Sequence, residues 1–264
     1  MTNYRRSGYV SADEGESWIR QWSQKIFPEI VCLFGGEPMM NPDVYKWIKL
    51  VRDYWPTSTL KIITNGFFFN KKPEIVRLLY DSQPSELQVS LHFRDDYHRK
   101  NILDGLIKTL KQTDLILKPC STRAPQEQRI FAKDDFKLII AEFGEFVKPY
   151  RGYGKTMRPW ESKNIIASHS HCGSPRNPVL YKNRIYKCGP IANLKDTLNL
   201  FGQVDSPQWE KYLSYVGFGI NDNLDPLIEN FGKPEWICSM CPSNNNSDIA
   251  HYDRDSVKVK KGAV

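Results

Sequence analysis

The regular alternation of apolar strands with amphipathic helices limits the possible folds of this chain more than any other feature. Apolar runs begin near residues 30, 60 and 87, so that a strand, a turn and a helix recur about every 28 residues. Strand–turn–helix units in series form parallel sheets through right-handed crossovers, either as a barrel or as a doubly wound sheet. The sequence therefore predicts an α/β fold in which ligand-binding residues gather where the strands end.

The other expected elements complete this outline. Helices are expected over residues 12–26, from Asn41-Pro42 to just before Pro56, over residues 72–81 and around residues 102–110. Further strands are expected over residues 115–117 and 136–141, and a hairpin over residues 179–187 turns at Lys182-Asn183. A short helical piece around residues 206–216 and a polar, frayed tail after Ser243 follow.

Length and composition indicate a cytoplasmic protein without a membrane span. The 264 residues suit one large domain, or one domain with an appended module, and 40% hydrophobic and 12% aromatic residues suffice for a core. The sequence has no apolar run of about 18 residues and no apolar signal-peptide core near Met1. We therefore expect no membrane partner.

The net charge of +7 and the pI of about 9.0 permit an anionic partner. The basic residues are scattered, however, and their densest patches are residues 148–163 and 258–261. This distribution favours a solvated basic surface over a nucleic-acid site. The patch with Arg151, Lys155, Arg158 and Trp160 fits either a solvated loop, which is favoured, or a pocket for an anionic or sugar-like group.

The tetrapeptide Gly35-Gly36-Glu37-Pro38 follows the first apolar run and precedes Asn41-Pro42, which has the pattern of a helix start. It therefore occupies a strand-to-helix turn, where α/β proteins bind ligands. Glycine lets the backbone approach a ligand closely, and a glutamate carboxylate can accept charge-assisted hydrogen bonds from an ammonium group. The alternative is a tight turn with a solvated glutamate.

Polar residues also end the next two strands. Thr64-Asn65-Gly66 ends the second apolar run, and Ser90 lies near the end of the third. Asn-Gly by itself fits a plain turn. Parallel strands end at one edge of a sheet, so these residues are expected near the glycine-rich turn.

Four cysteines in the second half of the chain suggest a metal centre. They are Cys172, Cys188, Cys238 and Cys241. The first two bracket the expected hairpin, and the last two form a C-x2-C pair. Four converging thiolates suit zinc or an iron–sulfur cluster, and the alternative is four unrelated buried thiols. Cys32 and Cys120 are expected to be inert core residues. His171 is expected to be a surface histidine, and the alternative is a hydrogen-bond donor to the cysteine set.

These features resemble the radical SAM enzymes that carry a C-terminal SPASM or twitch auxiliary-cluster module. The resemblance rests on Gly35-Gly36-Glu37-Pro38 with Asn41-Pro42, on Thr64-Asn65-Gly66, on residues 89–92 and on the cysteine set. It implies a partial (β/α)6 TIM-like barrel over residues 1–164. A small cysteine-rich auxiliary-cluster module with its tail is implied over residues 165–264.

The resemblance also implies cofactors and partners. S-adenosylmethionine is expected on Gly35, Gly36, Glu37 and Pro38, with Asn65 and Ser90 as further contacts and Ser90 near the ribose. An auxiliary [4Fe–4S] cluster is expected on the four cysteines, with zinc as the alternative. The implied activity is hydrogen abstraction from a substrate by a 5′-deoxyadenosyl radical, with an electron donor such as flavodoxin or ferredoxin. The sequence identifies neither the substrate nor the catalytic residues.

One family feature is missing from this sequence. The catalytic cluster of these enzymes is held by a C-x3-C-x2-C loop after the first strand, and no cysteine precedes Cys32 here. Met1 falls where that loop would end, and the first strand is missing too. The sequence thus suggests a truncated radical SAM protein. The alternatives are a degenerate, non-catalytic module with a structural Zn(Cys)4 site and, suggested by the pI, a nucleic-acid-modifying protein.

Overall fold

The computed structural model describes residues 7–92, 96–120, 128–142, 145–243 and 249–251. The chain divides into two compact units, one between Tyr9 and Gly144 and the other between Glu145 and His251. Most of the tail expected after Ser243, with the basic run at 258–261, lies outside the described residues. The described residues contain no helix long and apolar enough to cross a membrane.

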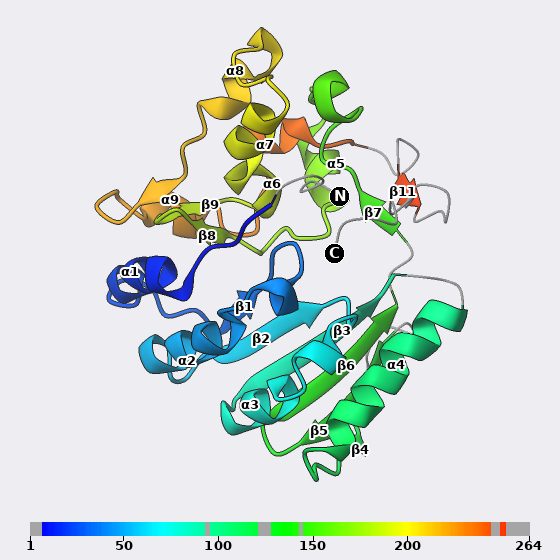
Figure 1. Ribbon diagram of the computed structural model, residues 1–264. Coiled ribbons are helices and arrows are strands. Elements are labelled where there is room, and N and C mark those ends of the chain that lie inside the picture. The colour runs from blue at the N-terminus through cyan, green and yellow to red at the C-terminus, as the bar shows by residue number, and fades with distance from the viewer. Residues whose placement is uncertain (1–6, 93–95, 121–127, 143–144, 244–248, 252–264) are drawn as a thin grey trace. The chain divides into compact units, whose positions relative to one another are not determined.

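The first unit is a mixed α/β fold built on a sheet with the strand order β1-β2-β3-β6-β5-β4 (Figure 1). Strands β1, β2, β3 and β6 are parallel neighbours, while β5 and β4 are antiparallel. The strands are β1 (Ile30–Leu33), β2 (Thr59–Thr64), β3 (Ser85–Leu91), β4 (Lys118–Pro119), β5 (Gln128–Lys133) and β6 (Phe136–Glu142). The helices, with η for a 3-10 helix, are α1 (Ala12–Trp22), η1 (Pro38–Met40), α2 (Val44–Tyr54), η2 (Phe69–Lys71), α3 (Ile75–Asp81) and α4 (Asp96–Lys111).

This architecture confirms the predicted α/β class, and the parallel strands are consistent with a partial TIM-like barrel. Three local predictions are corrected. Helix α1 ends at Trp22 and not at residue 26, and residues 115–117 form no strand. Helix α2 begins at Val44 and not at Asn41-Pro42. The reason is that the Asn41 side-chain oxygen accepts a hydrogen bond from the Asp43 N–H at 2.9 Å, which makes a turn before the helix.

Apolar side chains on one face of the sheet form the core of the first unit. Leu60 and Ile62 of β2 and Leu87 and Val89 of β3 are fully buried. These residues alternate along their strands and so point to the same face. Helices α3 and α4 lie on one side of the sheet (Figure 1). Burial of this face is the main source of stability for the unit.

Helices α1 and α2 approach each other closely at a glycine. A Cβ atom added to Gly15 would lie 1.8 Å from the Trp47 ring. Only a residue without a side chain fits there, so Gly15 sets the distance between the two helices. Trp22 and Ile48, one on each helix, are buried beside this contact in the core.

The second unit consists of short elements around a small core. Its strands are β7 (Glu145–Val147), β8 (Val179–Tyr181), β9 (Arg184–Tyr186), β10 (Phe218–Gly219) and β11 (Ile249–His251). Its helices are η3 (Gly154–Thr156), α5 (Ile165–Ser170), α6 (Gly189–Ala192), α7 (Leu194–Leu200), α8 (Pro207–Leu213), α9 (Asp225–Glu229) and η4 (Trp236–Met240). Strands β10, β9 and β8 form an antiparallel sheet, and β7 pairs with β11. The predicted hairpin and the helix near residue 210 are confirmed.

The core of the second unit includes residues that precede the expected boundary at 164. Tyr150 and Met157 pack in one buried cluster with Leu198, Trp209 and Met240. The division along the chain therefore lies before Glu145, about twenty residues earlier than the sequence pattern suggested. Residues 150–160 gave no periodic signal because their burial depends on contacts with distant segments.

Candidate functional site

The carboxylate of Glu37 joins the ends of strands β1 and β2. Its Oε1 accepts hydrogen bonds from the Met39 N–H at 3.0 Å and from the Thr64 hydroxyl at 2.7 Å. Its Oε2 accepts a hydrogen bond from the Asn65 N–H at 2.8 Å. Burial raises the pKa of Glu37 above its ordinary value, while these three hydrogen bonds act to lower it. The carboxylate thus holds the turn through three internal hydrogen bonds.

Thr64-Asn65-Gly66 forms a tight turn on the other side of this link. The Thr64 hydroxyl accepts a hydrogen bond from the Gly66 N–H at 3.0 Å, and the Asn65 side-chain oxygen accepts one from the Phe67 N–H at 3.0 Å. Gly66 has φ +79°, as expected for an Asn-Gly turn. A Cβ there would lie 2.5 Å from Ile102, so glycine is required. The Asn65 side chain therefore stabilises the loop in which Asn65 itself lies.

Gly35 and Gly36 lie in open space. A Cβ atom added at either position would meet no atom within 4 Å, and both residues are exposed. Packing within the described residues therefore does not require glycine here, in contrast to Gly66. Bare backbone beside a fixed turn is what a closely bound ligand needs.

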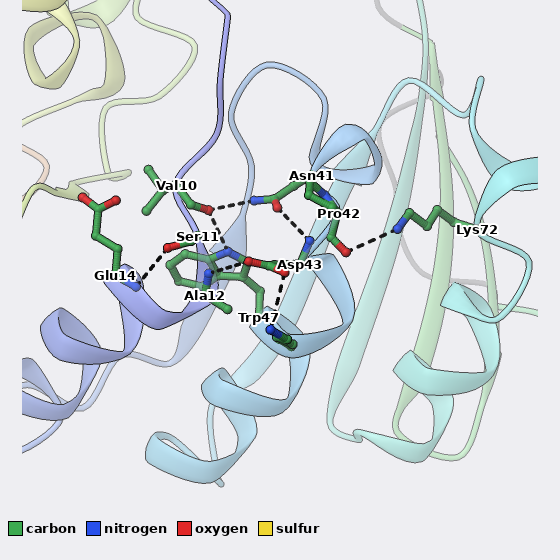
Figure 2. A network of polar contacts seen from close by, with 10 residues as sticks. Val10, Ser11, Ala12, Glu14, Asn41, Pro42, Asp43, Trp47 and Lys72 are labelled. Atoms are coloured by element: carbon green, nitrogen blue, oxygen red, sulfur yellow. Dashed lines mark hydrogen bonds and ion pairs between the residues drawn. The ribbon is translucent and has the colours of Figure 1, made fainter.

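A second network fixes the far side of the same loop to the segment before α1 (Figure 2). The Val10 carbonyl accepts hydrogen bonds from the Asn41 amide at 3.0 Å and from the Trp47 indole at 3.2 Å. The Asp43 carboxylate accepts one from the Ala12 N–H at 3.0 Å. Asn41 therefore does not cap helix α2 but aligns the chain preceding α1 with the loop after Gly35-Gly36-Glu37-Pro38.

Ser90 lies on the third strand of the same sheet edge. It is buried, and the Gln88 amide lies 3.5 Å from its hydroxyl oxygen. No hydrogen bond is present between Ser90 and Glu37 or Asn65 among the described residues. The structure thus joins Glu37, Thr64 and Asn65 directly, and it places Ser90 on the neighbouring strand without joining it to them.

The sheet face that carries Ser90 is polar, which the sequence interpretation did not anticipate. Lys61 of β2, Glu86 of β3 and Lys137 of β6 are aligned in register. The Glu86 carboxylate lies 3.1 Å from Lys61 Nζ and 3.6 Å from Lys137 Nζ. Parallel strands covered on both faces are usually apolar throughout. In the sequence, Lys61, Glu86 and Lys137 alternate with apolar residues, and this alternation could have indicated that one face of the sheet is polar.

The four cysteines come from three segments of the second unit. Cys172 follows α5, Cys188 lies between β9 and α6, and Cys238 and Cys241 lie within and at the end of η4. The Ser168 hydroxyl donates a hydrogen bond to the Cys241 carbonyl at 3.1 Å, which ties α5 to η4. Ser174 donates its N–H to the Cys172 sulfur at 3.3 Å. These contacts connect the segment that precedes Cys172 with the turn that ends at Cys241.

These thiols are close enough to interact electrostatically. Burial raises the pKa of Cys188 to about 12, and the charges of Cys172 and Cys238 add to the rise. Burial also raises the pKa of Cys241, with further contributions from the other three cysteines. Four thiolates gathered here without a cation would repel one another in a site of low dielectric constant. Four thiols are donors that a cationic metal centre takes, and binding of such a centre would remove that cost.

The side chains of the cysteine set are not already arranged as the ligands of a metal ion. Within the described ranges, no group of three or more His, Cys, Asp and Glu side chains is arranged to hold a metal ion. Cys32, on the polar sheet face, is remote from the set in sequence, and burial raises the pKa of its thiol to about 11. The raised pKa agrees with the inert thiol that was expected, but Cys32 is only partly buried and does not belong to the core.

His169 of α5 lies close enough to Lys187 and Glu235 to be affected by their charges. The His171 Nδ1 lies 2.8 Å from the Ala167 carbonyl at the end of α5. By contrast, the Nε2 atom of His169 is buried without a hydrogen-bond partner among the described residues. Burial lowers the pKa of His169, and the nearby Lys187 lowers it further. The imidazole of His169 is therefore favoured in its neutral form.

Part of the chain matches the model of a known protein family. Residues 2–113 match the model of the Radical SAM superfamily. The resemblance seen in the sequence is thereby confirmed for the segment that holds Glu37, Asn65 and Ser90. The four cysteines lie outside the matched residues.

The chain is similar to the crystal structure of BtrN in complex with AdoMet and 2-DOIA, with a TM-score of 0.46 and 14% sequence identity. That alignment covers 93% of this chain and 87% of the BtrN chain. No protein with curated annotation matches the chain.

Proposed function

We propose that the first unit binds S-adenosylmethionine at the turn formed by Gly35, Gly36, Glu37 and Pro38. The observation that carries this proposal is the Glu37 carboxylate, which fastens the turn to Thr64 and Asn65 across two parallel strand ends. A turn fixed in this way presents its open glycine backbone without reorganisation on binding. Preorganisation of this kind reduces the entropic cost of holding a ligand.

The chain's residues would then have distinct roles. The exposed backbone of Gly35 and Gly36 receives the ammonium group of the cofactor, since carbonyl oxygens accept hydrogen bonds from it. Glu37 keeps that backbone in place and adds negative charge nearby. The Ser90 hydroxyl, on the polar sheet face, is the contact for the ribose. The substrate would lie over the same face, beside Lys61 and Glu86.

We further propose that the four cysteines of the second unit hold an auxiliary [4Fe–4S] cluster. The radical SAM match of the first unit supports iron–sulfur chemistry for the protein. The mutual electrostatic effects of Cys188, Cys238 and Cys241 support their convergence on one centre. The competing proposal is a structural zinc ion on the same thiolates, which the four-cysteine donor set would also suit.

Where the ligands of a catalytic cluster are also present, the proposed activity is that of a radical SAM enzyme. A reduced catalytic cluster in such enzymes supplies the electron that splits S-adenosylmethionine and yields the 5′-deoxyadenosyl radical. The residues of this chain bind and orient the cofactor and exclude water from it. The present sequence contains no C-x3-C-x2-C motif. We therefore expect this 264-residue chain to bind the cofactor without releasing 5′-deoxyadenosine.

The binding proposal can be tested by calorimetric titration with S-adenosylmethionine. Gly36→Val places a branched side chain over the turn, and its Cβ would meet no protein atom within 4 Å, so we expect the fold to be kept. Gly173→Val is the matched control, because a Cβ at Gly173 also meets nothing within 4 Å. We expect Gly36→Val to weaken binding about tenfold or more and Gly173→Val to leave it unchanged. Equal affinity for the wild-type chain and Gly36→Val would refute the site.

Metal content discriminates the two proposals for the cysteines. After anaerobic purification and reconstitution, iron with acid-labile sulfide supports the cluster. About one zinc per chain with neither iron nor sulfide supports the structural zinc site. In the same preparation, dithionite and S-adenosylmethionine should give no 5′-deoxyadenosine. Its appearance would show that the chain holds a catalytic cluster after all.

A further inference from the structure

A buried lysine lies beside the cysteine set. Lys187 immediately precedes Cys188, and only 10% of its side chain is exposed. An ammonium group held in so little water needs several partners, because its desolvation is costly. Lys187 has three, and all of them come from the segment that leads into the other cysteine pair.

The partners of Lys187 define a bridge between two parts of the site. Its Nζ donates hydrogen bonds to the carbonyls of Asn230 at 3.0 Å and Lys233 at 2.6 Å. It also forms an ion pair with Glu235 at 2.8 Å. Together these contacts satisfy the three donors of the ammonium group.

The bridge ends at the second cysteine pair. The Glu235 carbonyl accepts a hydrogen bond from the Cys238 N–H at 2.9 Å, at the start of η4. The Glu235 side chain is only 19% exposed, so the ion pair is largely shielded from water. One lysine therefore links strand β9, which leads to Cys188, with the loop that leads to Cys238.

We propose that Lys187 is the positioning residue of the four-cysteine centre, holding Cys188 and the Cys238–Cys241 turn in register and contributing a positive charge beside the bound metal. The proposal rests on the function proposed above, because it requires that the cysteines hold a metal centre. Residues that orient metal ligands typically change metal affinity 10- to 100-fold, on the order of the effect expected here.

The charges of Lys187 and Glu235 lie close to the ligands along the chain. Lys187 immediately precedes Cys188, and its ion-pair partner Glu235 lies three residues before Cys238. A nearby positive charge favours the reduced, more negative state of an iron–sulfur cluster, so it raises the reduction potential. The ion pair thus sets both the geometry and the potential of the centre.

Two substitutions separate positioning from charge. Lys187→Met removes the bridge and the positive charge while keeping a long side chain. Glu235→Gln keeps an oxygen that can accept from the ammonium group but removes the compensating negative charge. Lys182→Met is the matched control, because Lys182 forms an exposed ion pair with Asp196 at 2.9 Å on the same hairpin.

The experiment compares reconstituted chains by metal and sulfide analysis and by a redox titration of the cluster absorbance. We expect Lys187→Met to retain about tenfold less cluster at limiting iron, with a lower midpoint potential in what remains. Glu235→Gln should retain the cluster with a higher midpoint potential, and Lys182→Met should match the wild-type chain. A midpoint potential that moves oppositely in the two variants is not expected from a merely structural role.

The outcomes distinguish this proposal from the one on which it rests. A wild-type chain that holds neither iron nor zinc after reconstitution refutes the proposed centre itself. A wild-type chain that holds a metal which Lys187→Met holds equally well refutes only the role of Lys187. If Lys187→Met fails to fold, an unchanged midpoint potential in Glu235→Gln still overturns the proposal.

Discussion

The two units of this protein build their candidate sites in opposite ways. In the first unit, the buried carboxylate of Glu37 has three protein donors, so the turn is complete without a ligand. In the second unit, buried thiols raise one another's pKa values, while the charge of Lys187 lowers those of Cys188 and Cys238. The comparison teaches that a cofactor site can be stable before binding, or can depend on the cofactor for its stability.

The sources of stability differ in the same way. The first unit buries one continuous apolar face of a parallel sheet, with Leu60, Leu87 and Phe136 fully buried. The second unit has short strands and helices around a small cluster, against which Cys188, Cys238 and Cys241 pack. Small cores of this kind gain much of their stability from a bound metal.

Metal removal should therefore have the largest effect, and only on one unit. We expect chelation to cost the second unit about 4 kcal/mol or more, the contribution of a ligand present at roughly a thousand times its dissociation constant. Hydrogen exchange should show lost protection in η4 and β9 with unchanged protection in β2 and β3. Equal loss of protection in both units would show that the second unit does not depend on the metal more than the first.

Glu37→Ala should have the next largest effect, this time on the first unit. The change leaves the Met39 and Asn65 N–H groups and the Thr64 hydroxyl without their acceptor, at a cost of about 2–4 kcal/mol. Urea unfolding of the first unit would measure this loss. The metal content of the cysteine set should stay at the wild-type level, and a parallel loss of metal would contradict the independence of the two sites.

Gly15→Ala tests whether helix packing stabilises the first unit. The added methyl would meet the Trp47 ring at 1.8 Å, so α1 and α2 must move apart. We expect a net loss of about 1–3 kcal/mol, because overpacking outweighs the better helix propensity of alanine. Gly105→Ala, at a helical glycine whose Cβ would meet its nearest neighbour at 3.6 Å, is the control. A stable Gly15→Ala variant would show that this contact is not limiting.

The smallest expected effect is the pH dependence of the contribution of Glu37 to the stability of the first unit. Since burial raises the pKa of Glu37, the folded chain keeps a proton that the unfolded chain has already released. The contribution of Glu37 to stability is therefore fully present below the unfolded pKa and falls as pH rises through the folded pKa. The wild-type chain should lose stability relative to Glu37→Gln across this window. Paired urea titrations from acidic to neutral pH would measure the difference, and a constant difference would exclude a raised pKa.

The sequence predicted the first unit better than the second. Strands β1, β2, β3 and β6 were found because apolar runs in parallel sheets are long and regular. The spacing of the cysteines was also readable from sequence alone. Residues 150–160 and the position of the unit boundary were not readable, because Tyr150 and Met157 are buried by residues far along the chain.

The candidate site was predicted in its residues but not in its contacts. Gly35, Glu37 and Asn65 were selected from sequence, and the contact of the Glu37 carboxylate with a ligand stays a prediction. The structure adds hydrogen bonds to this carboxylate from Thr64 and Asn65, which the sequence did not predict. Asn41 was taken for a helix cap, whereas it binds the Val10 carbonyl. Both differences arise from hydrogen bonds between residues that are distant in sequence.

The sequence by itself therefore determined the α/β class, the strand ends that carry the glycine-rich turn, and the cysteine set. These depend on local periodicity and residue chemistry, which a single chain displays directly. Only the tertiary structure decided that Glu37 closes the turn, that Lys61 and Glu86 share a polar face, and that Lys187 bridges the cysteine segments. Register and long-range pairing fix these contacts, and a linear pattern does not encode which distant donor meets which acceptor.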